Sequence, residues 1–314
     1  LKRCAPPRAW RRAFCATHAH CAPSYMGCGP SATSLVRSQS GEPRQSGASR
    51  AASPDSSPVA GSEASFGDSL PERHDFCEKY SVVGKLGSGA YGAVYKVQQR
   101  DTTQEFAAKV VDLRPKLGRG YGAQADQRQR QLAEDEAAIL RSVSGVPHVV
   151  KFVDFFLDDG FSYLVMQKCD QTLLSMLERH PRLTEASIQP ILREMLQAIA
   201  GIHMAGVVHR DIKPSNFMVA APGGAVRLCD FGLACRSQGA CGLTGTVGTF
   251  PYMAPEMLST KGYGSKVDVW AFGVATHALL LGCLPFRPAR RTGPALLAAI
   301  RRGLQPKACD GATQ

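Results

Sequence analysis

The sequence lacks the features that would mark a secreted or membrane-spanning protein. None of its 11 cysteines forms a CxxC pair, and the odd count is a poor disulfide framework that fits a reducing compartment, cytoplasmic or nuclear. No apolar run near the start is long enough for a secretory signal. An uncharged stretch at 269–286 reaches 18 residues, but its threonine, histidine, glycines and proline favour a helix buried in a globular lobe over a membrane span.

Acidic residues are absent from the beginning of the chain, where the first is Glu42. An acid-free start that contains arginines resembles an organelle transit peptide, but residues 31–72 consist mainly of Ser, Gly, Pro and Ala. Such a composition has too few bulky residues to bury, so we expect a disordered leader over 1–76. It holds a group of possible metal ligands whose spacing matches no zinc pattern: Cys15, His18, His20, Cys21 and Cys28.

Basic residues exceed acidic ones by 11 over the 314 residues, but the excess is unevenly distributed. Lys and Arg against Asp and Glu number 9 to 6 in residues 1–75, 22 to 19 in 76–285 and 6 to 1 in 286–314. The middle of the chain therefore has no strong basic stripe interleaved with aromatics, and we expect no nucleic-acid partner. Since 44% of the residues are hydrophobic, the chain can bury a substantial core.

Short apolar runs alternate with turn residues after Tyr80 and predict an antiparallel sheet; they span 80–86, 93–98, 106–111, 149–156 and 161–167. Between them, residues 124–143 have a helical pattern, although an insertion-like run at 114–131 predicts a loop before that helix. Beyond Asp170 the apolar spacing becomes helical. The pattern predicts a small β-rich lobe followed by a larger helical lobe.

The first motif with chemical meaning is glycine-rich and lies between two predicted strands, as Gly87-Ser88-Gly89-Ala90-Tyr91-Gly92-Ala93-Val94. Glycines let the backbone approach a phosphate closely. The strand that follows disfavours a dinucleotide fold, which needs a helix there. Lys109 then lies inside an apolar strand, where a buried cation needs an anionic partner such as Glu136.

Two further segments bring carboxylates, an amide and a lysine together, HRDIKPSN at 209–216 and DFG at 230–232. Acidic and amide oxygens can hold Mg²⁺, a carboxylate can orient an attacking hydroxyl, and cations can stabilise phosphoryl charge. With GTFPYMAPE at 248–256 and DVWAFG at 268–273, the motifs occur in one order. The sequence resembles the eukaryotic protein kinases over about 80–306, serine/threonine type, and within them the calmodulin-regulated and calcium-dependent group.

The resemblance implies an α+β, bilobal protein kinase fold with an N-lobe at about 77–167, a C-lobe at about 170–306 and a tail at 307–314. The family normally continues through further helices, so we expect the C-lobe to be incomplete and Glu256 to lack its usual arginine partner. Since the chain begins at Leu1 rather than Met, we also expect it to be partial.

The resemblance further implies ATP and Mg²⁺ as cofactors. Asp211 would orient the substrate hydroxyl and accept its proton, Lys213 would neutralise charge on the γ-phosphoryl group, and Lys109 would contact the α- and β-phosphates while paired with Glu136. Asn216 and Asp230 would bind Mg²⁺. The ATP site would be formed by the glycine-rich loop together with Leu86, Val94, Ala107, Met166, Gln167, Cys169 and Met218.

Lys213 and Thr249 indicate a serine/threonine kinase whose partners are protein substrates; the residues identify no regulatory partner. Arg210 beside Asp211 suggests control by a phosphate in the activation segment, on Thr244 or Thr246. His209 and Cys229 are expected to be packing residues, and Cys235 and Cys241 free thiols. Two functional classes stay open: an active kinase, and a non-catalytic ATP-binding or scaffold module.

Overall fold

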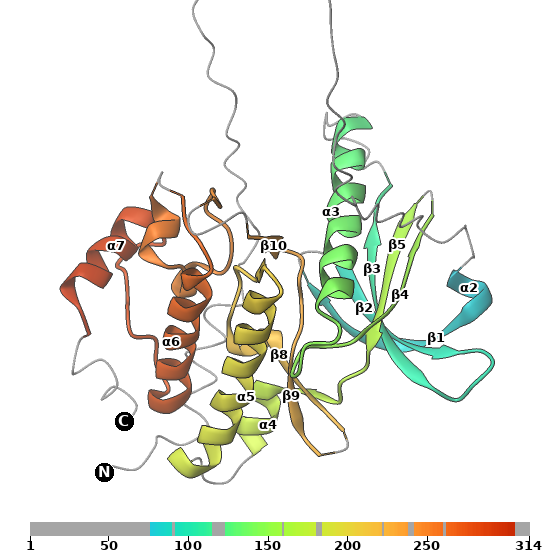
Figure 1. Cartoon of the computed structure of the whole chain (residues 1–314), viewed down its shortest axis with the longest axis horizontal. Coiled ribbons are helices and arrows are strands. Elements are labelled where there is room, and N and C mark those ends of the chain that lie inside the picture. The colour runs from blue at the N-terminus through green and yellow to red at the C-terminus, as the bar shows by residue number, and fades with distance from the viewer. Residues whose placement is uncertain are drawn as a thin grey trace, which may run out of the picture. The chain divides into compact units, whose positions relative to one another are not determined.

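The computed structural model describes residues 76–89, 92–114, 123–158, 160–179, 184–221, 223–237, 242–259 and 262–304. Residues 1–75 and 305–314 lie outside these ranges, as do the short gaps between them. The predicted leader up to residue 75, its Cys/His group and the C-terminal tail lie outside the described residues, whereas Phe76, predicted as the last leader residue, is buried and begins a helix. Within them, a β-rich lobe precedes a helical lobe in one unit of the chain, as the sequence pattern predicts (Figure 1).

The β-rich lobe is a five-stranded antiparallel sheet in the order β1-β2-β3-β5-β4. Its strands are β1 (Tyr80–Gly89), β2 (Gly92–Gln99), β3 (Glu105–Asp112), β4 (Phe152–Leu157) and β5 (Phe161–Gln167). A short helix, α2 (Phe76–Lys79), leads into the sheet. The predicted strands are all present, and that at 161–167 has the predicted bounds, whereas β4 begins three residues later than predicted.

Alternation along β3 gives the sheet two different faces. Phe106 and Ala108 are buried in an outer cluster with Tyr80, Val97 and Val165. The residues between them point to the opposite face, because successive side chains of a strand alternate. That alternation places Lys109 on the inner face.

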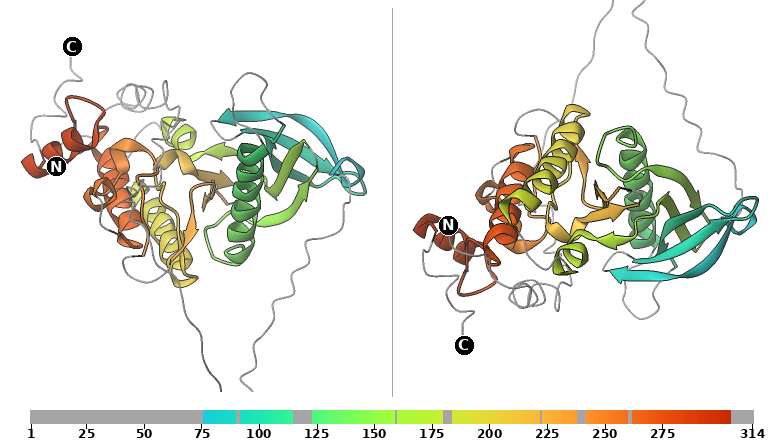
Figure 2. Two further views of the ribbon diagram at one scale, coloured as in Figure 1. Left: turned by 90° about the horizontal axis from the view of Figure 1, so that it is seen from above. Right: turned by 90° about the horizontal axis from the view of Figure 1, so that it is seen from below.

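Helix α3 (Ala123–Ser142) covers one face of the sheet and contacts β4 and β5 (Figures 1 and 2). Its inner residues Ala133, Ala137 and Leu140 are buried. The predicted loop at 114–131 is wrong in its second half, because the helix already begins at Ala123. Residues 123–131 are mostly Ala, Gln and Arg, whose high helix propensity favours continuing the helix.

The helical lobe is formed by α4 (Leu173–Arg179), α5 (Glu185–Met204), α6 (Lys266–Leu281) and α7 (Gly293–Arg302). Thr184 caps α5 in a capping box with Ser187. One face of α5 is buried, as its helical spacing predicts: Ile188, Met195, Ile199 and Ile202. Helices α5 and α6 pack side by side in this lobe (Figure 1).

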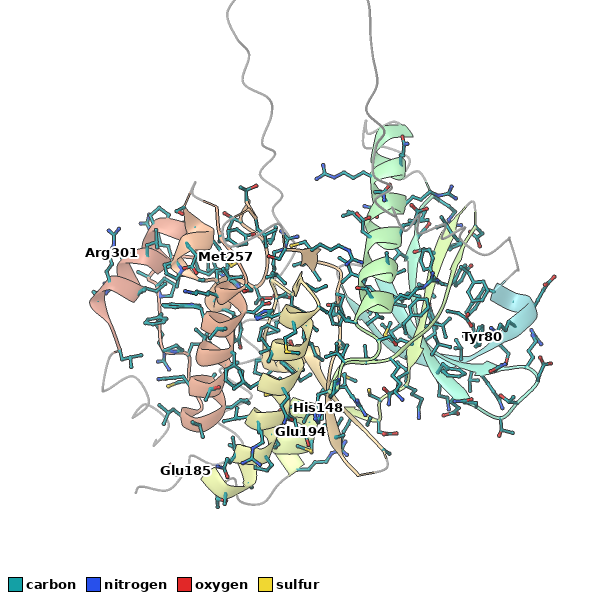
Figure 3. All side chains as sticks on the ribbon, in the orientation of Figure 1. Tyr80, His148, Glu185, Glu194, Met257 and Arg301 are labelled. Atoms are coloured by element: carbon teal, nitrogen blue, oxygen red, sulfur yellow. The ribbon has the colours of Figure 1, made fainter. Side chains whose placement is uncertain are left out.

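Short strands and 3₁₀ turns flank the loops that carry Asp211, Lys213 and Asp230. The strands are β6 (Gln171–Thr172), β7 (Val207–Val208), β8 (Phe217–Ala220), β9 (Ala225–Leu228) and β10 (Cys235–Arg236). The turns are η1 (Pro214–Asn216), η2 (Phe250–Tyr252) and η3 (Pro255–Leu258). Glu194 of α5 fixes β9, since its Oε2 accepts from the Val226 N–H at 2.7 Å and lies 3.5 Å from Nδ1 of His148 (Figure 3).

Most of the uncharged stretch forms α6, which is a helix of the globular lobe as predicted. Val267, Ala271, Val274 and Ala278 are buried, while Val269 is half exposed. None of the helices in the described ranges combines the length and hydropathy needed to cross a membrane.

Candidate active site

A buried ion pair, Lys109 with Glu136, and the partly exposed Asp230 form a cluster of three charges that joins the sheet, α3 and the segment after β9. Lys109 Nζ lies 2.7 Å from Oε1 and 2.9 Å from Oε2 of Glu136, and 3.1 Å from Oδ1 of Asp230. Lys109 and Glu136 are each only 8% exposed. The lysine therefore has the anionic partner that its apolar strand predicted.

The electrostatics of this cluster keep Lys109 and Asp230 charged, whereas burial raises the pKa of Glu136 in spite of the Lys109 ammonium beside it. Burial alone would lower the pKa of Lys109, but the Glu136 and Asp230 carboxylates outweigh it, and the pKa is raised. Burial works to raise the pKa of Asp230, and the Lys109 ammonium overcomes it, so that this pKa is lowered. A lysine and an aspartate that stay ionised can hold phosphate and a metal ion.

Asp211, the predicted substrate-orienting carboxylate, is held from three sides. Its Oδ2 accepts from Lys213 Nζ at 2.7 Å and from Asn216 Nδ2 at 3.2 Å. Its Oδ1 accepts from the backbone N–H of Thr249 at 2.8 Å. Lys213 Nζ also donates to Oγ1 of Thr249 at 2.8 Å, which links the loop after β7 to the segment before η2.

Asp268, at the start of α6, is fully buried and contacts the loop that carries Asp211. Its carboxylate accepts from the backbone N–H groups of His209 and Arg210, each at 2.8 Å, and lies 2.8 Å from Nε2 of His203. Arg210 has φ +65°, a left-handed conformation that is costly for a residue with a side chain. The two hydrogen bonds that Asp268 accepts favour this turn and so position Asp211.

The DFG segment packs directly on the same loop. Phe231 is buried and its ring lies edge-on to His209 at 5.0 Å. His209 is fully buried with Nε2 at 3.1 Å from the Cys229 carbonyl, so it packs and positions the backbone, as expected. Burial also raises the pKa of the Cys229 thiol, which agrees with a packing role for that residue.

The glycine-rich loop is formed by the facing ends of β1 and β2, which contain Leu86, Gly87, Ser88, Gly89, Ala93 and Val94. Gly92 has φ +137°, and a Cβ there would lie 2.4 Å from the Val110 carbonyl oxygen, so the fold itself requires glycine. A Cβ on Gly87 or Gly89 would meet nothing within 4 Å. These two positions are open toward the space that a phosphate would need, while Ala90 and Tyr91 lie outside the described residues.

The predicted adenine-contacting residues come from neighbouring strands. Val94 pairs with Lys109, and Ala107 with Met166, across the sheet. Gln167 ends β5, and Cys169 follows it in a partly buried position. Met218 lies on β8 of the helical lobe, paired with Thr172, so the two lobes together supply this set.

The residues predicted to bind Mg²⁺ supply suitable donors, a carboxylate from Asp230 and an amide oxygen from Asn216. Within the described residues, no group of three or more His, Cys, Asp and Glu side chains could hold a metal ion. The pair would therefore need further oxygen ligands, and Mg²⁺ characteristically takes these from the phosphates of a bound nucleotide and from water.

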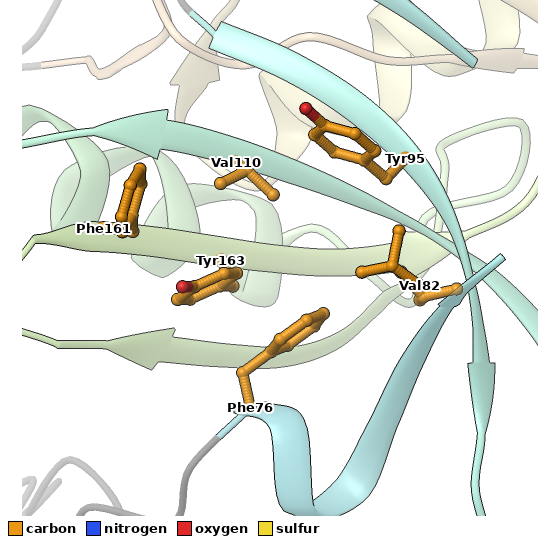
Figure 4. A pocket seen from close by; sticks show the side chains of 7 residues that line it. Phe76, Val82, Tyr95, Val110, Phe161 and Tyr163 are labelled. Atoms are coloured by element: carbon orange, nitrogen blue, oxygen red, sulfur yellow. The ribbon is translucent and has the colours of Figure 1, made fainter. Parts of the chain in front are cut away.

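An apolar hollow of about 210 Å³ lies elsewhere on the β-rich lobe (Figure 4). Its lining includes Phe76, Tyr95, Val110 and Tyr163. Val110 and Lys109 are adjacent in β3 and so point to opposite faces. The hollow is thus separate from the charge cluster.

Sequence reasoning missed the role of Asp268, which appeared only as part of a motif. The available signal was a single carboxylate at the start of a helix with no other charged residue after its first turn. An isolated buried acid of this kind must accept hydrogen bonds from neighbouring segments. Here they come from residues 58 and 59 positions earlier.

Comparisons with known proteins agree with this geometry. The family model for the protein kinase domain matches residues 80–302. The chain is 32% identical over 231 residues to the phosphorylase b kinase gamma catalytic chain, liver/testis isoform, of Bos taurus, which covers 70% of this chain and 55% of that one. It is 34% identical over 218 residues to the calcium/calmodulin-dependent protein kinase type II alpha chain of Drosophila melanogaster, covering 67% and 39%.

A third relative is the calcium/calmodulin-dependent protein kinase type II subunit delta of Oryctolagus cuniculus, 34% identical over 215 residues and covering 67% of this chain and 38% of that one. The chain thus spans about half, or less, of the length of these curated relatives. The predicted resemblance to serine/threonine kinases of this group is confirmed.

Proposed function

Because the chain belongs to the protein kinase family, we propose that it transfers the γ-phosphoryl group of Mg²⁺-ATP to serine or threonine hydroxyls of proteins. The observation that supports this most directly is the environment of Asp211. Its carboxylate is hydrogen-bonded to Lys213, Asn216 and Thr249, and the Lys109–Glu136–Asp230 cluster belongs to the same site. The arrangement offers a base, a phosphate-binding cation and metal donors.

In the proposed reaction, Asp211 orients the substrate hydroxyl and accepts its proton. Lys213, 2.7 Å from Asp211, is placed to stabilise negative charge on the transferred group. Lys109 would hold the nucleotide phosphates, and its ion pair with Glu136 fixes the ammonium in place. Asn216 and Asp230 would hold Mg²⁺, which when bound neutralises phosphate charge.

Control through the activation segment is part of the proposal. Thr246 Oγ1 donates to the Met257 carbonyl at 3.0 Å, and Thr244 precedes it in the same segment. Arg210 Nε donates to the Leu233 carbonyl at 2.7 Å, and the rest of its guanidinium could pair with a phosphate. Loss of activity in Thr244→Ala/Thr246→Ala protein, with phosphate found there by mass spectrometry, would support this control. Full activity without phosphate would contradict it.

Phosphate transfer to a generic protein substrate tests the proposed reaction. The protein should transfer phosphate from radiolabelled Mg²⁺-ATP to serine or threonine, and the Asp211→Asn variant should not. Equal incorporation by both, in folded samples, would leave the non-catalytic ATP-binding or scaffold module as the better reading.

We also propose that the protein works in a reducing compartment, the cytoplasm or nucleus. The absence of CxxC pairs supports this, as do the free thiols of Cys77, Cys169, Cys229 and Cys235, although Cys283 is disulfide-bonded. Imaging of the tagged protein in cells would test the assignment.

A further inference from the structure

One stretch of the sequence in the helical lobe carries basic residues without any acidic ones, although Glu256 lies on η3, which contacts α7. The chain has no Asp or Glu between Asp268 and Asp310. Within that stretch the described residues include five arginines, all exposed: Arg287, Arg290, Arg291, Arg301 and Arg302. We refer to these five as the arginine face.

The ion pairs found in the described part of the chain do not involve the arginine face. By contrast, cations of the β-rich lobe such as Lys79, Lys96 and Arg114 each contact a carboxylate. Like charges repel one another, so neighbouring arginines without an ion pair among the described residues destabilise the isolated fold. A counter-charge from outside these residues would relieve the repulsion.

The two ends of α7 carry different parts of the arginine face. Arg301 and Arg302 are in the last turn of α7, where the helix dipole favours cations even without a ligand. Arg287, Arg290 and Arg291 precede α7, at the end where the dipole disfavours them. Stabilisation of the helix therefore accounts for Arg301 and Arg302 but not for the three arginines that precede α7.

The position of the first three relates them to the proposed reaction. Helix α7 packs against η3, and a Cβ on Gly293 would lie 3.8 Å from Leu258. Turn η3 ends the segment whose Thr249 binds Asp211. Arg301 lies at the outer end of α7, away from Met257 of η3 (Figure 3). The beginning of α7, two residues after Arg291, therefore lies beside the end of the activation segment.

We propose that the arginine face binds an acidic segment, rich in Asp, Glu or phosphorylated residues, of the protein that is phosphorylated. This inference rests on the proposed kinase function and adds a substrate class to it. Guanidinium groups form paired hydrogen bonds with carboxylates and phosphates, so charge complementarity identifies this occupant. A ten-residue helix is about 15 Å long, so about five extended residues could reach from one end of α7 to the other.

An acidic protein segment fits this face better than a nucleic acid does. Binding of single strands usually combines cations with exposed aromatic rings on which bases stack. The aromatic residues of this region, Trp270 and Phe286, instead stack on each other at 5.6 Å and are partly buried. Residues 269–309 contain no acidic residue, and the rings of Trp270 and Phe286 are not exposed for stacking. Recognition at the arginine face would therefore depend on charge.

Two fluorescent peptides test the proposal, each with one serine, flanked by glutamates in one and by lysines in the other. Asp211→Asn protein is used, so that no phosphate is transferred during binding. Fluorescence anisotropy at low salt should show the glutamate peptide binding at least about fivefold more tightly, with the difference shrinking as salt screens the charges.

Three charge-matched variants locate the binding. Arg290→Glu/Arg291→Glu should weaken binding of the glutamate peptide by roughly fivefold or more, and Arg301→Glu/Arg302→Glu by a smaller factor. The control, Lys151→Glu/Arg193→Glu, changes exposed cations on other elements and should leave binding within about twofold. Thermal unfolding of each variant verifies that it is folded.

The outcomes separate this inference from the proposed function. The inference would be overturned if protein with all five arginines bound both peptides equally well. It would also be overturned if the Lys151→Glu/Arg193→Glu control lost as much affinity for the glutamate peptide as the Arg290→Glu/Arg291→Glu variant. A single-stranded RNA whose binding, unlike that of the peptide, depended on Arg290 and Arg291 would overturn it as well. If the glutamate peptide binds as expected but protein with Asp211 intact transfers no phosphate to it or to a neutral peptide, the docking surface stands and the kinase function fails.

Discussion

The backbone N–H of Thr249 donates a hydrogen bond to Oδ1 of Asp211 at 2.8 Å. Residues 38 positions apart are thereby joined, and the Thr249 hydroxyl adds a second link through Lys213 at 2.8 Å. The candidate base is therefore positioned by the segment before η2 as well as by its own loop. Changes in that segment should affect catalysis without direct contact with ATP.

Thr249→Val should lower kcat about tenfold to a hundredfold, because it removes the hydroxyl that accepts from Lys213 and leaves the ammonium without that partner. Thr249→Ser retains the hydroxyl and should keep activity within a few fold. Steady-state assays on one neutral peptide make the comparison. Equal activity of the valine and serine variants would show that the side-chain link is dispensable.

Gly248→Ala should lower both stability and activity. Gly248 has φ +100°, and a Cβ there would lie 2.3 Å from the Arg210 carbonyl oxygen, so the segment must move away from Asp211. Strain of this kind costs about 1–3 kcal/mol. As a control, Gly273→Ala lies in exposed mid-helix α6 with open space around it and should stabilise the protein by about 0.5–1 kcal/mol. Urea denaturation measures both changes.

The elements with strong periodicity could be predicted from the sequence, and so could the residues that the motifs bring together. The strand at 161–167 and the buried face of α5 follow directly from spacing. Lys109, Glu136 and Asp230 meet although the last is 121 positions from the first. The pair of Lys109 with Glu136 was predicted, because each motif has a fixed place in the fold that the resemblance supplied, whereas the contact of Lys109 with Asp230 was not.

Backbone conformations and surface hollows that depend on long-range packing were not predicted. The left-handed backbone at Arg210 and Asp230 has no local sequence signal, because it follows from packing against Asp268 and Lys109. The outer hollow beside Phe76 depends on how the curved sheet meets α2, which alternation alone does not specify. The helical pattern at 124–143 predicted the beginning of α3 to within one residue, whereas the loop predicted at 114–131 overlapped the helix, because glutamines and arginines are equally common in loops and exposed helices.

Asp268→Asn should destabilise the protein by about 2–4 kcal/mol, even though the side chain keeps its size. The carboxylate accepts from two backbone N–H groups, and an amide offers one oxygen and one NH₂, so one of the buried contacts would be lost. Urea denaturation should show the loss, and Asp101→Asn at an exposed position should not. A stability unchanged from that of the parent would contradict this role for Asp268.

Cys169 should react slowly with iodoacetamide at neutral pH. Burial raises the pKa of its thiol to about 11, so the reactive thiolate is scarce and its fraction grows about tenfold per pH unit up to that value. Exposed Cys77 should be labelled first. A non-hydrolysable ATP analogue with Mg²⁺ should protect Cys169 but not Cys77. Mass spectrometry of the two peptides reports both rates, and equal labelling of Cys169 with and without the analogue would place this thiol outside the nucleotide site.

Lys109→Met should abolish most activity and also destabilise the fold. The substitution leaves the buried carboxylate of Glu136 and the nearby Asp230 without their cation, at a cost of about 3–5 kcal/mol. Because the pKa of Lys109 is raised, its stabilising contribution is fully present below the unfolded value near 10.4 and is lost only as pH rises through the folded value. Titration of Lys109 should therefore not change the stability difference between parent and variant, measured by urea denaturation, between about pH 7 and 9.

The matched variant Lys96→Met breaks the exposed pair with Glu105 and should change stability by less than about 1 kcal/mol. Equal effects of the two substitutions would show that burial of the Lys109 pair does not govern its contribution.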